Sequence, residues 1–354
     1  MMSSSANPFC LQMSVKDFAR RVCESVNQPY TSDLIRATQS TFDISQCVML
    51  TELLTVLPES LGQLTSLATL NLASCDLLTT LPESLGQLTV LKTLNLSHCV
   101  MLTGLPESLG QLTALSALHL TVCRALTKLP DSLCRLAALT LLDLCECEVL
   151  TVLPESLGDL AALTALDLSY CNALTRLPNS LGQLAALETL YLRECTVLTG
   201  LPESLSQLTV LTTLHLDDCI ALTGLPESLG RLSALDTLDL THCRSLTNLP
   251  ESLGQLANLD CLIIDYCTSL RRIPISCVDL PARCLSTPCL GLSSIVFPTW
   301  DIMETNETAI RRFILAHHRP LQFLTLILAA GDIDHLPDEL WVTIYQQYPA
   351  YDIV

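Results

Sequence analysis

A proline recurs every 24 residues through the middle of the chain, without a change in spacing. The ten prolines are Pro58, Pro82, Pro106, Pro130, Pro154, Pro178, Pro202, Pro226, Pro250 and Pro274. Between them leucines return at fixed offsets, as in LATLNLASCDLLTTLPESLGQL. A fixed period of this length is typical of proteins in which each unit packs only on its neighbours. The sequence therefore predicts a solenoid rather than one compact core.

Each copy of the phrase contains the signals of a strand and of a short helical turn. In the copy that begins at Leu67, Leu70 and Leu72 alternate with polar or small residues, which is the period of a half-buried strand. Cys75 then turns the chain, and Pro82 is a suitable first residue for a short α- or 3₁₀-helical segment. We expect the strands to form a parallel sheet on a concave face and the helical segments to lie on the convex face.

The phrase L-x-x-L-x-L-x-x-C-x-x-L-T-x-L-P-E-S-L-G-Q-L resembles a leucine-rich repeat. It is similar to the intracellular repeats of plant disease-resistance receptors and of Ras-suppressor-like proteins. The resemblance covers about residues 47–280 and implies an α/β horseshoe that recognises other proteins. A nucleotide switch is not implied, because the chain has no G-x-x-x-x-G-K-[ST] loop.

Nine of the eighteen cysteines share one position of the repeat, where many leucine-rich repeats carry an inward asparagine. They are Cys75, Cys99, Cys123, Cys147, Cys171, Cys195, Cys219, Cys243 and Cys267. A thiol can fill that position as a small buried group with a weak S–H donor. We predict reduced, buried thiols. Together with the missing signal-peptide pattern at the start, they predict a cytoplasmic location.

The formal charge of −18 argues against nucleic acid and favours a protein partner with a basic surface. Part of that charge follows the repeat proline, where an acid in the first helical turn complements the helix dipole, so we interpret those acids as solvated stabilisers of the convex face. No apolar run is long enough to cross a bilayer, so no membrane partner is expected.

The outward strand positions vary most, and their acids begin at Asp143. We predict that the partner-binding residues on the concave face are Asp143, Glu146, Asp167, Tyr170, Tyr191, Arg193, Glu194, His215, Asp217, Asp218, Asp239, His242, Asp265 and Tyr266. His215, Asp217 and Asp239 could face one another and hold a divalent cation, but solvated polar residues on a binding face explain them equally well. The prediction includes no metal and no cofactor.

The repeats divide the chain into a capping region at 1–46, a solenoid at 47–280, and a linker with a helical cap at 281–354. Cys47 precedes Pro58 by eleven positions rather than seven, so the first repeat is expected to be four residues longer. We predict a monomeric, non-catalytic interaction module or scaffold, with signalling or defence as possible settings.

The alternative is a ubiquitin-ligase component that selects substrates. Residues 336–344 resemble the first helix of an F-box, although too few residues follow for the rest of that domain. Cys277-Val-Asp279 matches a short motif of bacterial ubiquitin ligases. A three-residue motif arises readily by chance, so it does not change the prediction that the chain is not an enzyme.

Overall fold

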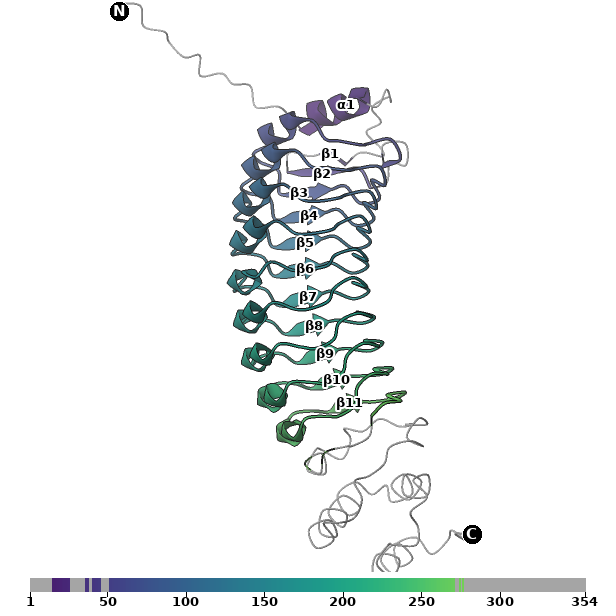
Figure 1. Ribbon diagram of the computed structural model, residues 1–354. Coiled ribbons are helices and arrows are strands. Elements are labelled where there is room, and N and C mark those ends of the chain that lie inside the picture. Colours follow the sequence, from purple (N-terminus) through teal and green to yellow (C-terminus); the bar gives the residue numbers. More distant parts are fainter. Residues whose placement is uncertain are drawn as a thin grey trace, which may run out of the picture. The chain divides into compact units, whose positions relative to one another are not determined.

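A computed structural model describes residues 15–25, 36–37, 40–45, 51–270, 274 and 276 of the chain. The chain divides into two compact units, residues 1–187 and 188–354, and both are built from the predicted repeat (Figure 1). The predicted linker and helical cap at 281–354, the F-box-like segment and Cys277-Val-Asp279 lie outside the described residues. Among the described residues, no helix has the length and apolar character needed to cross a bilayer.

Each repeat contributes one three-residue strand. In the first unit the short strand β1 (Arg36–Ala37) pairs antiparallel with β2 (Thr41–Asp43), and parallel pairing continues from β2 to β7. In the second unit β8 to β11 also pair in parallel in chain order. The other strands are β3 (Thr69–Asn71), β4 (Thr93–Asn95), β5 (Ala117–His119), β6 (Leu141–Asp143), β7 (Ala165–Asp167), β8 (Thr189–Tyr191), β9 (Thr213–His215), β10 (Thr237–Asp239) and β11 (Cys261–Ile263).

The strand register confirms both the period and its single exception. Leu70 lies opposite Leu94, which is one repeat of 24 residues later. Phe42 lies opposite Leu70, so the first repeat is longer by the four residues that the position of Cys47 predicts. Strands β1 and β2 both lie before residue 47, so the sheet begins within the segment assigned to the cap.

A 3₁₀ turn follows each of the nine repeat prolines from Pro58 to Pro250, and in each unit these turns lie to one side of the strands (Figure 1). At Pro82 the backbone is extended (φ −72°, ψ 149°), so the first helical residue is the acid Glu83 and not the proline. The turns are Glu59–Gln63, Glu83–Gln87, Glu107–Gln111, Asp131–Arg135, Leu157–Asp159, Asn179–Gln183, Glu203–Gln207, Glu227–Arg231 and Glu251–Gln255.

The leucines of each repeat form a continuous core between the strands and the 3₁₀ turns within each unit. In the copy around β4, for example, Leu85, Leu88, Leu91, Leu94 and Leu96 are all fully buried. A buried aliphatic side chain contributes about 1.5–3 kcal/mol of transfer free energy. A single repeat cannot enclose its leucines alone, so the stability resides in the stack.

Helix α1 (Val15–Ser25) lies beside the first strands of the first unit. It buries Phe18, whose ring meets that of Phe42 edge to face at 5.2 Å between centroids. Phe42 and Ile44 occupy the places that leucines fill in later repeats, and both are fully buried. Neither β1 nor β2 follows the 24-residue period, so neither was predicted from the sequence.

The prediction for the cysteine row is confirmed. All nine cysteines are buried and free of disulfides. The Sγ of Cys99 donates a hydrogen bond to the carbonyl oxygen of Leu72 in the preceding repeat, at 3.4 Å, and Cys123 does the same to Leu96 at 3.2 Å. The thiol thus takes the role of the inward asparagine, linking one coil to the previous one.

Candidate binding face

A tight turn follows each strand and shapes the face that the sequence analysis selected. Nine residues with side chains adopt the left-handed backbone conformation there, with φ between 52° and 63°. They are Ser74, His98, Val122, Glu146, Tyr170, Glu194, Asp218, His242 and Tyr266. These residues therefore lie in a turn after the strand, and not on the strand as expected.

An aspartate or asparagine at the strand end holds many of these turns. Its Oδ1 accepts a hydrogen bond from the backbone N–H two residues later, at 3.1 Å from Asn71 to Ala73 and 3.0 Å from Asn95 to Ser97. Three predicted binding residues, Asp143, Asp167 and Asp239, accept the same bond at 3.1, 2.8 and 2.9 Å. Side chains interpreted as free for binding therefore also stabilise the repeat.

In the first unit, Asp143 is the centre of a small polar cluster. Its Oδ2 accepts a hydrogen bond of 2.7 Å from the hydroxyl of Thr121 and lies 3.9 Å from Nδ1 of His119. Burial raises the pKa of Asp143, but the nearby imidazole of His119 and hydrogen bonds from Thr121 and the N–H of Cys145 outweigh it and hold the pKa below its ordinary value. The carboxylate is thus ionised at neutral pH.

Arg124 changes the electrostatics of the first-unit face, and sequence reasoning missed it. Its guanidinium pairs with Glu146 at 2.7 Å and with Glu148 at 2.9 Å. Arg124 lies two residues after the left-handed residue Val122, outside the outward positions of the strand. The remaining predicted residue of this unit, Tyr170, is partly exposed in the turn after β7.

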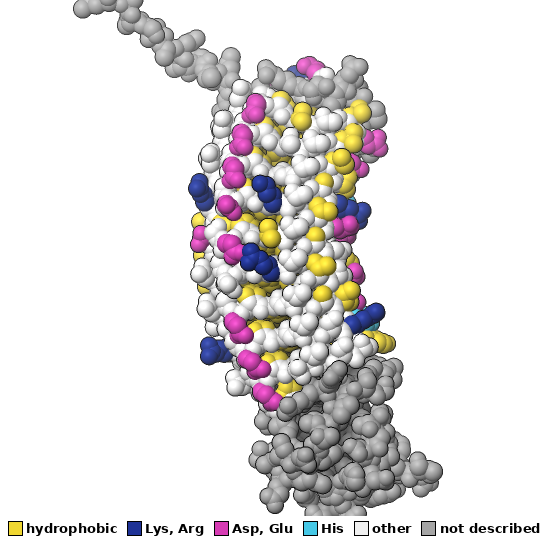
Figure 2. All heavy atoms as spheres, in the orientation of Figure 1, with side chains coloured by type: hydrophobic (Ala, Val, Ile, Leu, Met, Phe, Trp, Pro, Cys, Tyr) yellow, Lys and Arg dark blue, Asp and Glu magenta, His cyan; other side chains and the backbone are white. Residues whose placement is uncertain are grey.

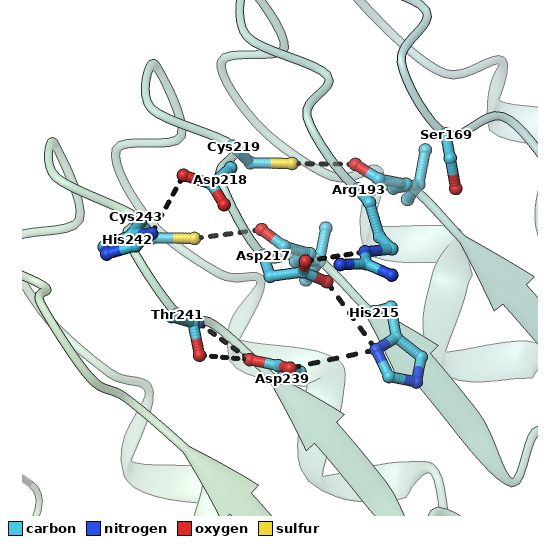
Figure 3. A network of polar contacts seen from close by, with 12 residues as sticks. Ser169, Arg193, His215, Asp217, Asp218, Cys219, Asp239, Thr241, His242 and Cys243 are labelled. Carbon is cyan, nitrogen blue, oxygen red and sulfur yellow. Dashed lines mark hydrogen bonds and ion pairs between the residues drawn. The ribbon is translucent and has the colours of Figure 1, made fainter. Parts of the chain in front are cut away.

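The second unit holds a denser network, centred on Asp217 (Figure 3). The side chain of Asp217 is only 8% exposed, although the sequence pattern predicts an outward position. Its Oδ2 accepts a hydrogen bond of 2.7 Å from Nε of Arg193, the corresponding residue of the previous repeat. A buried carboxylate requires such a partner, because an unpaired charge away from water is costly.

His215 faces two carboxylates at once, as Figure 3 shows. Its Nδ1 lies 3.6 Å from Oδ1 of Asp217 and 3.9 Å from Oδ2 of Asp239. The three ligand atoms lie within 4.8 Å of one another. The ring of Tyr191 contacts the imidazole at 5.4 Å between centroids. The structure thus brings together the three residues that the sequence analysis considered as a cation site.

A second histidine couples the last turns of the described repeats. Nδ1 of His242 lies 3.0 Å from Oδ1 of Asp218, and its ring contacts that of Tyr266 at 4.7 Å. Tyr266 is 50% exposed. The other two predicted residues take part through the backbone: the N–H of Glu194 donates to Asp217 and the carbonyl of Asp265 accepts from His242.

Several of the acids after the repeat prolines accept hydrogen bonds from the following repeat. Figure 2 shows acidic side chains gathered along the side that bears the 3₁₀ turns. Oε2 of Glu59 accepts the backbone N–H of Ser84 at 3.2 Å, and Glu83 accepts that of Ser108 at 3.1 Å. Glu203 accepts the hydroxyl of Ser228 at 2.6 Å. Each of these carboxylates joins its repeat to the next one.

Comparison with known proteins agrees with the architecture. Two family models described as leucine-rich repeat match, one at residues 137–197 and the other at 66–88 and 90–112. No curated protein sequence matches the chain. The specific resemblance to disease-resistance receptors stays a prediction.

Among solved structures, the leucine-rich repeat domain of the type III effector XopL is 22% identical, with 80% of this chain and 90% of that one covered and a TM-score of 0.50. A leucine-rich repeat protein of Leptospira interrogans is 22% identical over 85% and 97% of the two chains, with a TM-score of 0.42. A chain of the Drosophila Toll–Spatzle complex is 25% identical over 65% and 32%, with a TM-score of 0.52. The likenesses to the XopL domain and to the chain of the Toll–Spatzle complex show the fold, a repeat solenoid of the kind that generally presents an extended surface for binding proteins.

Proposed function

We propose that this leucine-rich repeat protein is a non-catalytic interaction protein that binds a polypeptide with a basic surface. The binding surface is the acidic face of the second unit. We define this face as the outward strand positions and the turns that follow them within 188–266. We further expect a monomer that works in the cytoplasm. A complex of Toll with Spatzle occurs among the structures with this fold, which supports protein binding as the activity.

The charge of the acidic face is the observation that carries this proposal. Its strand and turn positions hold eight carboxylates and two guanidiniums, those of Arg193 and Arg244. The carboxylates belong to Glu188, Glu194, Asp217, Asp218, Asp236, Asp239, Asp260 and Asp265. Like charges this close repel one another, whereas a basic partner would be attracted and steered toward them.

An aromatic anchor lies beside these acids. Tyr266 is half exposed and its ring is held against His242, which in turn pairs with Asp218. Tyrosine is enriched at the centres of protein interfaces because it buries a large area at a small cost in side-chain entropy. The surface therefore combines a long-range attraction with a rigid contact point.

The test must avoid acids that hold the fold. Asp217 is buried and Asp239 supports a turn, so charge reversal there would change stability together with binding. Asp236 is exposed and Asp260 is partly exposed, and neither stands at the turn-holding position. The variant Asp236→Lys/Asp260→Lys is the better choice, and Glu107→Lys/Glu227→Lys is the control with the same change in charge on the 3₁₀ side.

A random peptide library displayed on phage is selected against the full-length chain at low salt, and the enriched peptides are then titrated against each variant. We expect peptides rich in lysine and arginine. Their affinity should fall about tenfold or more in the acidic-face variant and as salt rises, but much less in the control. Enrichment of acidic or neutral peptides, or an equal loss in both variants, would contradict the proposal.

A further inference from the structure

We propose that His215, Asp217 and Asp239 bind one divalent transition-metal ion, with Zn²⁺ as the best fit. The site lies within the acidic face but does not depend on the protein-binding proposal, because the ion is measured without any partner. The ligand atoms are Nδ1 of His215, Oδ1 of Asp217 and Oδ2 of Asp239.

The spacing of the three atoms suits a small cation placed between them. Zinc binds imidazole nitrogen and carboxylate oxygen at about 2.0–2.2 Å, so tetrahedral ligand atoms lie about 3.3–3.5 Å apart. Nδ1 of His215 lies 3.6 Å from Oδ1 of Asp217 and 3.9 Å from Oδ2 of Asp239. These two separations are too long for hydrogen bonds, and all three ligand atoms lie within 4.8 Å of one another, so rotation of the side chains toward a central ion would complete the coordination.

Asp217 provides an independent reason to expect a cation. Its side chain is more than nine-tenths buried, and Oδ1 accepts no hydrogen bond although it is inaccessible to water. A buried carboxylate oxygen without a donor costs free energy that a bound ion would recover. Figure 3 shows this oxygen directed at His215.

The opposite oxygens of the two carboxylates are already held in place. Arg193 donates to Oδ2 of Asp217 at 2.7 Å. Thr241 donates its N–H and its hydroxyl to Oδ1 of Asp239 at 2.9 and 2.6 Å. Each carboxylate thus presents its other oxygen toward His215. Supporting hydrogen bonds of this kind orient the ligands of metal sites in proteins.

The ligand types favour a transition metal over Ca²⁺ or Mg²⁺. An imidazole with two carboxylates suits zinc, cobalt or nickel, whereas calcium and magnesium prefer oxygen ligands alone. Three protein ligands leave the fourth tetrahedral position for water or for a side chain of a bound protein.

The first unit offers a matched cluster that lacks the third ligand. His119 and Asp143 correspond to His215 and Asp239. Thr121 stands at the repeat position of Asp217, and its hydroxyl donates a hydrogen bond of 2.7 Å to Oδ2 of Asp143. Asp143 and Asp239 stand at the same position of the repeat, but Asp143 is not part of the proposed site. Asp143→Asn is therefore the control for Asp239→Asn.

In the test, the untagged full-length chain is treated with a chelator and then titrated with Co²⁺. Binding is measured by calorimetry and by the visible absorption of the ion. We expect one ion per chain. Asp239→Asn should weaken binding about 100-fold, by comparison with the 10–100-fold losses seen for supporting residues. Asparagine holds the same turn in the repeats of Asn71 and Asn95, so this variant should fold. Asp143→Asn should bind as the original chain does.

Three results would overturn the proposal. One is the absence of saturable binding, and another is an equal loss of affinity in Asp239→Asn and Asp143→Asn. The third is undiminished binding in both Asp239→Asn and His215→Gln, which would place the ion elsewhere. An absorption band from cobalt bound to thiolate would accompany that third result if the cysteines were the ligands.

Discussion

The Sγ of Cys219 lies 3.0 Å from the carbonyl oxygen of Leu192 and donates a hydrogen bond to it across one repeat. Cys243 makes the same bond to Leu216 at 3.2 Å, and Cys267 makes it to Leu240 at 3.1 Å. The carbonyl belongs to the leucine directly after a strand, where the chain leaves the sheet. A thiol is a weak donor, but it is small enough to sit among leucines and still satisfy a buried acceptor.

Removing this donor should therefore destabilise the stack. We expect Cys219→Ala to lower the free energy of unfolding by about 1–2 kcal/mol, through the lost hydrogen bond and a small cavity. Cys261→Ala is the control, since Cys261 is partly exposed and lies outside the row. Urea denaturation of both variants checks the prediction, and equal stabilities would show that the bond contributes nothing.

Buried thiols also make the protein sensitive to alkali. Burial raises the pKa of Cys147 and of Cys219 from the ordinary value of 9.0 to about 12. Between these values the unfolded chain loses thiol protons that the folded chain keeps, so stability falls as the pH rises. Each such thiol should lower the free energy of unfolding by about 1.4 kcal/mol for every pH unit above 9.

This sensitivity is measured by urea denaturation from about pH 8.5 to about pH 10.5 under reducing conditions. The decline should be shallower in Cys219→Ala than in the original chain, by the contribution of one thiol. A parallel decline in both proteins would mean that groups other than this cysteine cause it.

The repeat could be predicted from the sequence because its constraints are local and recur with one period. Spacing alone places Leu70 and Leu94 in register and puts Cys99 against the previous coil. The longer first repeat is likewise visible in the position of Cys47. These features follow from which residues must be buried, and hydrophobic periodicity reports burial directly.

The polar contacts between repeats could not be predicted in the same way. The repeat pattern puts Asp217 at an outward position, yet its side chain is only 8% exposed and pairs with Arg193. Such a contact depends on the length and direction of side chains in adjacent repeats, which periodicity does not encode. The role of Asp239 did leave a signal: asparagine or aspartate recurs at the strand end, two residues before a small or polar residue, as in a turn held by a side chain.

The left-handed turn should be improved by glycine. Ser74 is exposed and has a φ of 62°, a conformation that costs a residue with a side chain about 1–2 kcal/mol and glycine almost nothing. After the greater chain entropy of glycine is deducted, Ser74→Gly should stabilise the first unit by about 0.5–1 kcal/mol. Ala73→Gly, one residue earlier and outside the left-handed region, should instead destabilise it. Thermal unfolding of the two variants decides, and loss of stability in both would contradict this interpretation of the turn.

Arg193 and Asp217 should be strongly coupled in stability. Removing the guanidinium leaves a buried carboxylate without its partner, so Arg193→Ala should cost about 2 kcal/mol. Adding Asp217→Ser should recover most of that loss, because serine occupies the same repeat position at Ser97 and at the buried Ser169. A double-mutant cycle by urea denaturation, with chelator present so that no bound ion contributes, gives the coupling energy. We expect about 1–3 kcal/mol. If the two single substitutions prove additive, the pair does not account for the burial of Asp217, and the network around His215 must be held by other contacts.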